Sequence, residues 1–147
     1  MESGNVAIKV RASFLAKHLQ KHNVLSATTI ILYDLRFPVN YDGFRYLKIA
    51  IPHALQNPSQ MVASEIYDAV SEQYSPKAAA QNVGVAIHEI IDRAWQSQAD
   101  DRWSWYLPDY LMERQKSPSN LEFISAIVNF LELWQDCYEK EVAYERA

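Results

Sequence analysis

The amino-acid sequence predicts a single, mainly α-helical domain, and three observations support this. Four long segments repeat apolar residues every three or four positions, the spacing that gives a helix one buried stripe. The 147 residues are 49% hydrophobic, which is enough for one domain with a genuine core. Three Gly and six Pro are too few for a fibrous or low-complexity protein.

The first residues of the chain hold two short elements. Val6–Val10 alternates apolar and polar residues, as a short strand does, although no partner strand is evident. Phe14–His22 has the periodicity of a helix instead. We therefore expect a short strand or arm at the N-terminus, followed by a helix over Phe14–His22.

The four long helices are expected between residues 41 and 141. The apolar spacing predicts them at Tyr41–Leu55, Met61–Tyr74, Ala78–Trp95 and Asn120–Glu141. Pro52, late in the first helix, predicts a kink or a local break. Asn57-Pro58-Ser59 is placed to cap the second helix, and Ser75-Pro76 predicts a turn before the third. Ser119 or Asn120 is expected to cap the fourth.

Two further features interrupt this pattern. Gly84 lies inside the third predicted helix, where glycine costs about 1 kcal/mol relative to alanine. We therefore expect Gly84 to mark close packing against another backbone. Asp100–Arg114 is rich in aromatic residues and is broken by Pro108, so it predicts short helical turns or an ordered loop.

The sequence carries no arrangement of residues that indicates an enzyme. Cys137 is the single cysteine, so no internal disulfide is expected, and it lies in a helical pattern rather than in a nucleophile motif. His18 and His22 would share one helix face, yet no third ligand or general base follows at a diagnostic spacing. We interpret them as surface histidines. We therefore expect no catalytic activity, no metal ion and no cofactor.

No segment of the sequence indicates export or a membrane. Met1–Val10 lacks the apolar core of a secretory signal, and no apolar run approaches membrane-spanning length. We therefore expect a cytoplasmic protein with no membrane partner.

The net charge of −4 conceals an asymmetry along the chain. Residues 1–50 hold seven Lys or Arg and three Asp or Glu, a net charge of +4, whereas residues 51–147 carry −8. Such a distribution orients a protein near a polyanion or an oppositely charged partner, or it is an accident of surface composition. The average charge argues mildly against nucleic acid, because nucleic-acid binders usually have a basic footprint.

The predicted helices at 61–74 and 78–95, joined by a short turn, have the plan of a helix-turn-helix. In that plan the second helix enters the major groove of DNA and its N-terminal residues reach base edges. Gln81 and Asn82 suit this role because both amides can make two hydrogen bonds to adenine. The residues expected there are Ala79, Gln81 and Asn82, and Val85, His88 and Glu89 are expected further along the same outer face. The alternative is a plain helical hairpin in an all-α core.

Four motifs in order resemble one family. Phe37–Ile51 holds a Pro, then Gly-aromatic-x-Tyr-Leu, a basic residue and an Ala-Ile pair. The other motifs are Ile66-Tyr67 with Tyr74, Ala86-Ile87 with Ala94-Trp95, and Ser117–Ile124. Together they resemble the C-terminal DNA-binding effector domain of the master sporulation response regulator, the stage zero protein A family of sporulation initiation factors. The match runs from about Ser26 to Leu133.

The resemblance implies an all-α domain of about six helices that contains a helix-turn-helix. It implies a transcription regulator that binds double-stranded DNA and has no enzyme activity. The domain would span residues 26–147 and end in a long helix, with residues 1–25 as a basic N-terminal extension. In that family a phosphorylatable receiver domain precedes the effector. Because roughly 25 residues are too few for a receiver, control by phosphorylation is not carried over.

The predicted recognition helix departs from the family pattern. The family displays several arginines and a glutamate on its DNA face. In this sequence Asn82, Val85 and His88 hold the arginine positions, and Gly84 holds that of the glutamate. Because one Arg–guanine pair provides about 1–3 kcal/mol of discrimination, these changes predict weaker binding through this face.

Basic residues are also scarce around that helix. Residues 61–95 hold two basic and five acidic residues, a net charge of −3. Near the C-terminal motif, Ser117 stands where the family has a lysine, although Lys116 precedes it. Neutralisation of phosphates supplies most of the non-specific affinity for DNA, so we expect this affinity to depend on the N-terminal basic residues.

Two functions follow from these observations. In the first, the chain is a DNA-binding transcription regulator with an arginine-poor recognition helix, and Lys77 and Lys116 contact phosphates. In the second, it is a DNA-binding-defective relative that serves as a protein–protein interaction module. The aromatic residues that would bind the partner are Trp103, Trp105 and Tyr106, unless they cover the core. RNA polymerase, another protein or a second copy of the chain in a homodimer are the further partners considered.

Overall fold

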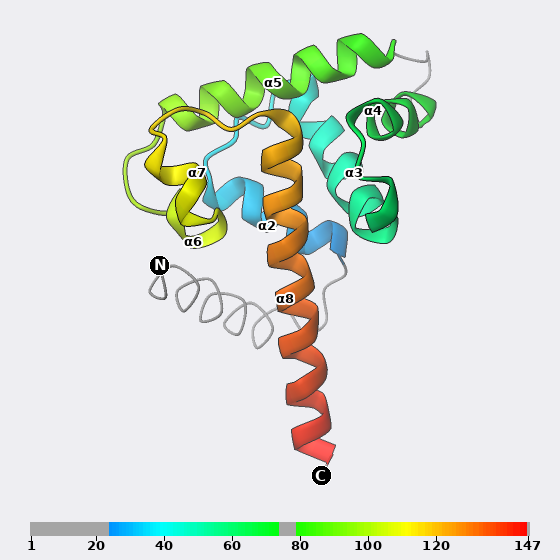
Figure 1. Ribbon diagram of the computed structural model, residues 1–147, viewed down its shortest axis with the longest axis vertical. Helices are drawn as coiled ribbons and strands as arrows, with labels where there is room; N and C mark the ends of the chain where they lie inside the picture. Colours follow the sequence, from blue (N-terminus) through cyan, green and yellow to red (C-terminus); the bar gives the residue numbers. More distant parts are fainter. Residues whose placement is uncertain (1–23, 74–78, 147) are drawn as a thin grey trace.

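The computed structural model describes residues 24–73 and 79–146, and within these ranges every element is a helix (Figure 1). The elements are α2 (Val24–Asp34), α3 (Asp42–Gln56), the one-turn 3-10 helix η1 (Pro58–Gln60), α4 (Ala63–Glu72), α5 (Ala80–Gln96), α6 (Trp103–Tyr106), α7 (Asp109–Glu113) and α8 (Asn120–Arg146). The all-α prediction is confirmed for this part of the chain. The strand predicted at Val6–Val10 and the helix at Phe14–His22 lie outside the described residues.

The four long helices predicted from apolar spacing are present as α3, α4, α5 and α8. Their ends differ from the predicted ones by one or two residues, except that α8 continues beyond Glu141 to Arg146. The aromatic segment Asp100–Arg114 forms the short helices α6 and α7, as expected. The apolar pattern did not single out α2, and the predicted turn at Ser75-Pro76 falls outside the described residues.

Pro52 does not break α3, and the expectation that the segment beginning at Asn57 caps α4 is wrong. Helix α3 continues through Pro52 and ends at Gln56, because the buried side chains of Ile51 and Ala54 hold its last turns against the core. Asn57 does not cap α4. Its backbone N–H donates to the carbonyl of His53, and its side-chain amide donates to the same oxygen over 2.9 Å, so it closes α3 instead.

The core is centred on α3, which packs against α2, α4, α5 and α8. Its buried side chains recur every three or four residues, which is the stripe that the sequence pattern predicted. They are Phe44, Tyr46, Leu47, Ala50, Ile51 and Ala54. Because this stripe is buried against four other helices, α3 forms the centre of the core.

An aromatic cluster fixes the C-terminal end of α5. The rings of Phe37, Trp103 and Phe123 lie 5.2–5.8 Å apart between centroids, and Trp95 meets Trp103 edge to face at 5.2 Å. Such pairs add about 0.5–1.5 kcal/mol each beyond the burial of their area. The cluster therefore ties α5 to α6 and to the start of α8.

Two glycines set how closely α5 approaches its neighbours. A Cβ on Gly43 of α3 would lie 2.8 Å from Cγ2 of Ile90 and still closer to the carbonyl oxygen of Ala86. A Cβ on Gly84 would lie 2.7 Å from Cε2 of Tyr67. The expectation that Gly84 meets another backbone is wrong, because its neighbour is a ring; Gly43 is the glycine that packs on a backbone.

The N-terminus of α8 carries a reciprocal cap. The Ser119 hydroxyl accepts the N–H of Glu122 over 3.2 Å, and the Glu122 carboxylate accepts the N–H of Ser119 over 2.9 Å. Arg114 donates two hydrogen bonds to the same carboxylate, over 2.8 and 2.9 Å. The predicted cap at Ser119 is confirmed. The Arg114 guanidinium, with the N–H of Ser119, lowers the pKa of Glu122 from its ordinary value of 4.5 to about 2.

The second half of α8 extends beyond the other helices, at the bottom of Figure 1. Its first half, with buried Phe123, Ile127 and Leu131, packs against α3, α5 and α2. Of the helices in the described ranges, none is long and apolar enough to span a membrane.

Gly43→Ala tests the contact between α3 and α5. We expect this substitution to lower the free energy of unfolding by about 1–3 kcal/mol, because the added methyl group must push against the backbone at Ala86. Ser64→Ala, at an exposed position of α4, is the control, and its stability should stay within about 0.5 kcal/mol of the unaltered chain. Urea denaturation measures both, and a Gly43→Ala variant as stable as the unaltered chain would contradict the packing.

Glu122→Gln tests the cap of α8. A carboxyl whose pKa is lowered by folding stabilises the fold above its ordinary pKa, and this stabilisation disappears as pH falls through the lowered value. Near neutral pH we expect Glu122→Gln to lower the free energy of unfolding by up to about 1 kcal/mol. The difference should shrink between pH 4.5 and about 2. Glu132→Gln, exposed on the same helix, is the control. If the free energy of unfolding differs between Glu122→Gln and the unaltered chain by the same amount at every pH, the cap does not depend on the charged Glu122 carboxylate.

Candidate nucleic-acid interface

Helix α5 has one buried and one exposed face. Its buried residues are Val83, Ile87, Ile90, Ile91 and Ala94, which pack on α3, α4 and α8. Those predicted to contact bases lie on the opposite side, beginning with Ala79 at the N-cap. Gln81, Asn82, Val85 and His88 are all exposed. We call these five residues the outer face of α5. The structure therefore brings the predicted base-contacting residues together on one surface.

The side chains of the outer face are free to meet a ligand. Val85 is 66% exposed, more than the other exposed valines of the described residues, Val39 at 46% and Val62 at 49%. Among the described residues, none hydrogen-bonds to the side chains of Gln81, Asn82 or His88, whereas several other polar side chains of α5 are paired. The amides of Gln81 and Asn82 therefore keep both a donor and an acceptor for an external partner.

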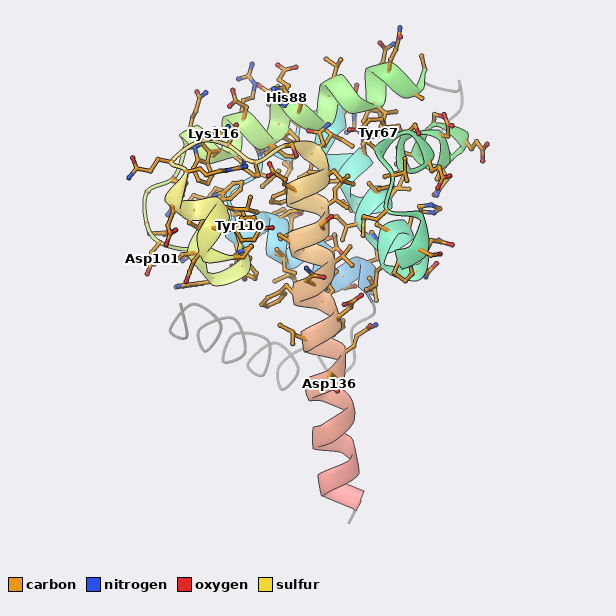
Figure 2. The ribbon with its side chains drawn as sticks, in the orientation of Figure 1. Tyr67, His88, Asp101, Tyr110, Lys116 and Asp136 are labelled. Atoms are coloured by element: carbon orange, nitrogen blue, oxygen red, sulfur yellow. The ribbon has the colours of Figure 1, made fainter. Side chains whose placement is uncertain are left out.

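A shallow, mostly apolar groove runs along one side of the outer face. It is lined by the starts of α4 and α8 and by the first half of α5. Its residues are Ala63, Tyr67, Gln81, Gly84, Val85, His88, Ser119, Asn120 and Leu121. In Figure 2, Tyr67 and His88 lie on neighbouring helices at the top of the molecule, whereas Asp136 lies on the extended part of α8. Three helices thus meet at the groove.

Asn120 joins the three helices that form this groove. Its side-chain amide donates to the hydroxyl oxygen of Tyr67 over 2.8 Å and to the carbonyl oxygen of Gly84 over 2.8 Å. The absence of a side chain at Gly84 leaves room for the Tyr67 ring beside α5. The sequence motifs contained Tyr67 and Asn120, but no local pattern indicated that they meet at α5.

The acidic residues around α5 are largely turned away from its outer face or paired. Glu65, Asp68 and Glu72 are exposed and lie three and four residues apart, so they share one face of α4. Ala63 and Tyr67, which line the groove, lie on the other face of that helix.

The charged residues in the second half of α5 also have partners. Glu89 pairs with Arg93 over 3.2 Å, and the Arg93 guanidinium lies 4.9 Å from the centre of the Tyr41 ring. Asp92 accepts hydrogen bonds from Gln96 over 3.0 Å and from the hydroxyl of Ser117 over 3.1 Å. The negative charge that the sequence places on α5 is therefore partly neutralised.

Lys116 lies beside α5. It is exposed, on the segment that precedes α8, and its neighbour Ser117 is bonded to Asp92 of α5. Figure 2 shows Lys116 close to α5. Lys77, the other predicted phosphate contact, lies outside the described residues.

The aromatic residues of the alternative function occupy the core. Trp103 is 2% exposed and Tyr106 is 1% exposed, and Trp105 is half-buried with the Arg102 guanidinium 5.8 Å from its ring. The Tyr106 hydroxyl donates to the Asp34 carboxylate. The core interpretation of these residues is confirmed for Trp103 and Tyr106. In this segment Tyr110 is the aromatic side chain with a large exposed area, 66%.

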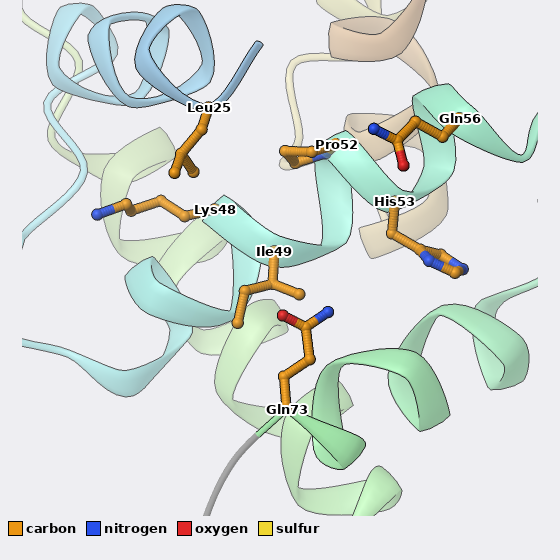
Figure 3. A pocket seen from close by; sticks show the side chains of 7 residues that line it. All are labelled: Leu25, Lys48, Ile49, Pro52, His53, Gln56 and Gln73. Atoms are coloured by element: carbon orange, nitrogen blue, oxygen red, sulfur yellow. The ribbon is translucent and has the colours of Figure 1, made fainter. Parts of the chain in front are cut away.

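A second hollow, of about 270 Å³, lies away from α5 (Figure 3). Residues of α2 and α3 line it together with Gln73, which follows α4: Leu25, Lys48, Ile49, Pro52, His53, Gln56 and Gln73. Gln73 reaches toward Ile49 in Figure 3. In the described part of the chain no cluster of three or more His, Cys, Asp or Glu is arranged to hold a metal ion.

Comparison with known proteins gives one family. Residues 28–131 match the family model of the sporulation initiation factor Spo0A C terminal. The match covers more than two thirds of the chain, includes α3, α4 and α5, and lies within the range from Ser26 to Leu133 that the motifs predicted. No curated protein matches the chain.

Proposed function

The chain belongs to the family of Spo0A C-terminal domains, non-catalytic DNA-binding effector domains of transcription regulators, and on this premise we propose that it binds duplex DNA through the outer face of α5. The observation that carries the proposal is the outer face itself. Four candidate side chains, those of Gln81, Asn82, Val85 and His88, are exposed on α5, the helix that follows α4 in the chain and packs against it, as the recognition helix of a helix-turn-helix does.

The outer face favours base contacts over phosphate contacts. Its members are neutral amides, an apolar side chain and one histidine, with no arginine or lysine. The one arginine of α5, Arg93, is in the last turn and is engaged with Glu89 and Tyr41. We infer that α5 is an arginine-poor recognition helix. Its discrimination then lacks the Arg–guanine pairs that provide about 1–3 kcal/mol each.

Phosphate contacts are assigned to lysines near α5 in the structure or in the sequence. Lys116 is exposed next to α5, and Lys77 lies three residues before Ala80, the first residue of this helix, in the sequence. The basic residues of the first 25 positions add further positive charge. Each phosphate neutralised releases condensed counterions, so affinity should fall steeply with salt.

Fluorescence anisotropy with a random-sequence duplex tests this function. At about 50 mM salt we expect micromolar binding that weakens as the salt concentration rises. Lys116→Ala should weaken binding and reduce the slope of log K against log salt by about one, because it removes one phosphate contact. Lys48→Ala, the same change of charge on α3, is the control.

The combined variant Gln81→Ala and Asn82→Ala separates base from phosphate contacts. It should lose preference among sequences while it keeps most of its salt-dependent, non-specific affinity. If the unaltered chain does not bind any duplex at micromolar concentration and low salt, the proposed function is wrong.

A further inference from the structure

We propose that the outer face of α5 selects A·T base pairs, with Val85 contacting the 5-methyl group of a thymine and Asn82 or Gln81 bonding a neighbouring adenine. The inference rests on the proposed function and specifies its target. Its carrying observation is an apolar side chain, 66% exposed, with the polar side chains of Asn82, Gln81 and His88 around it and an apolar groove on one side.

Val85 does not contribute to the buried core. The buried stripe of α5 passes through Val83 and Ile87, on the other side of the helix. In the major groove the thymine 5-methyl is the apolar group presented by a base pair, and apolar side chains contact it. A G·C pair presents no methyl group in this groove, so it offers Val85 no equivalent apolar contact.

The surroundings of Val85 extend its apolar surface on one side. The groove continues from Val85 over Gly84 to the ring of Tyr67 and to Leu121. Gly84 has no side chain to stand between Val85 and that ring. A methyl group that reaches Val85 therefore enters a mostly apolar hollow, where its surface is removed from water.

The polar neighbours of Val85 favour adenine. Among the described residues, the amides of Asn82 and Gln81 have no partner, and each presents the donor and acceptor that adenine N7 and N6 require. From Asn82 to Val85 the helix rises about 4.5 Å, on the order of one base-pair step. Glu89, which is chemically suited to cytosine, is held by Arg93 over 3.2 Å.

The experiment has two stages. First, duplexes with a randomised centre are selected for binding to the full chain and sequenced; we expect the selected centre to be rich in A·T pairs. Second, each thymine of the best duplex is replaced in turn by deoxyuridine, which removes the 5-methyl group alone. At one thymine the affinity should fall about fourfold, the factor that corresponds to one buried methyl group.

Variants of Val85 assign that effect. Val85→Ala should bind the thymine duplex less tightly and should no longer distinguish thymine from deoxyuridine at that position. Val85→Thr, which keeps one branched methyl group, should retain much of the distinction. Because Val85 is exposed, thermal unfolding of both variants should match that of the unaltered chain.

The outcomes separate this inference from the proposed function. Salt-dependent duplex binding together with a G·C-rich selected centre, or with no position sensitive to deoxyuridine, overturns the A·T inference and leaves DNA binding intact. A deoxyuridine effect that persists unchanged in Val85→Ala also overturns the role of Val85. Failure to bind any duplex overturns both proposals.

Discussion

The approach of α3 to α5 at Gly43 is the contact on which the arrangement of the candidate interface depends. Gly43 lets the first turn of α3 lie against the backbone of α5 at Ala86, and a side chain there would hold the two helices apart. With α5 seated in this way, Val83, Ile87 and Ile91 enter the core and the residues between them face outward. The aromatic cluster at Trp95 then fixes the far end of the same helix. The outer face is thus a consequence of how α5 is packed.

The packing of α4 and α5 also decides where the acidic residues of segment 61–95 lie in the folded chain. The segment 61–95 carries a net charge of −3, which argues against DNA when it is taken as an average. In the folded chain Glu65, Asp68 and Glu72 share the face of α4 away from the groove, and Glu89 is paired with Arg93. Four of the five residues of the outer face have no ionisable side chain and the fifth is a histidine, and Glu89 is exposed beside them, one turn after Val85. We propose that this surface contacts bases and that the affinity for phosphates comes from Lys116 and from basic residues outside the described ranges.

Local patterns in the sequence were sufficient for most helices and for one cap. A single apolar stripe identifies α3, α4, α5 and α8, because burial on one side is repeated every turn. The Ser119–Glu122 cap was equally local. Helix α2 was missed because its sequence, Val24–Asp34, is apolar over much of its circumference and shows no contrasting polar face.

The groove could not be predicted in the same way. It forms where the starts of α4 and α8 meet α5. The Asn120 amide bonds the carbonyl oxygen of Gly84, 36 residues away in the chain, and the hydroxyl of Tyr67, 53 residues away. A glycine in a helix indicates that something lies close to it but not what. Gly84 was therefore assigned a backbone contact, whereas its neighbour is the Tyr67 ring.

The most direct test of DNA binding through α5 is a titration of the ¹⁵N-labelled chain with duplex DNA, followed by NMR. The account predicts shifts of the amides of Ala80–Glu89, with smaller shifts at Ala63 and at Lys116–Leu121. Shifts confined to α6 and α7, with α5 unchanged, would contradict it.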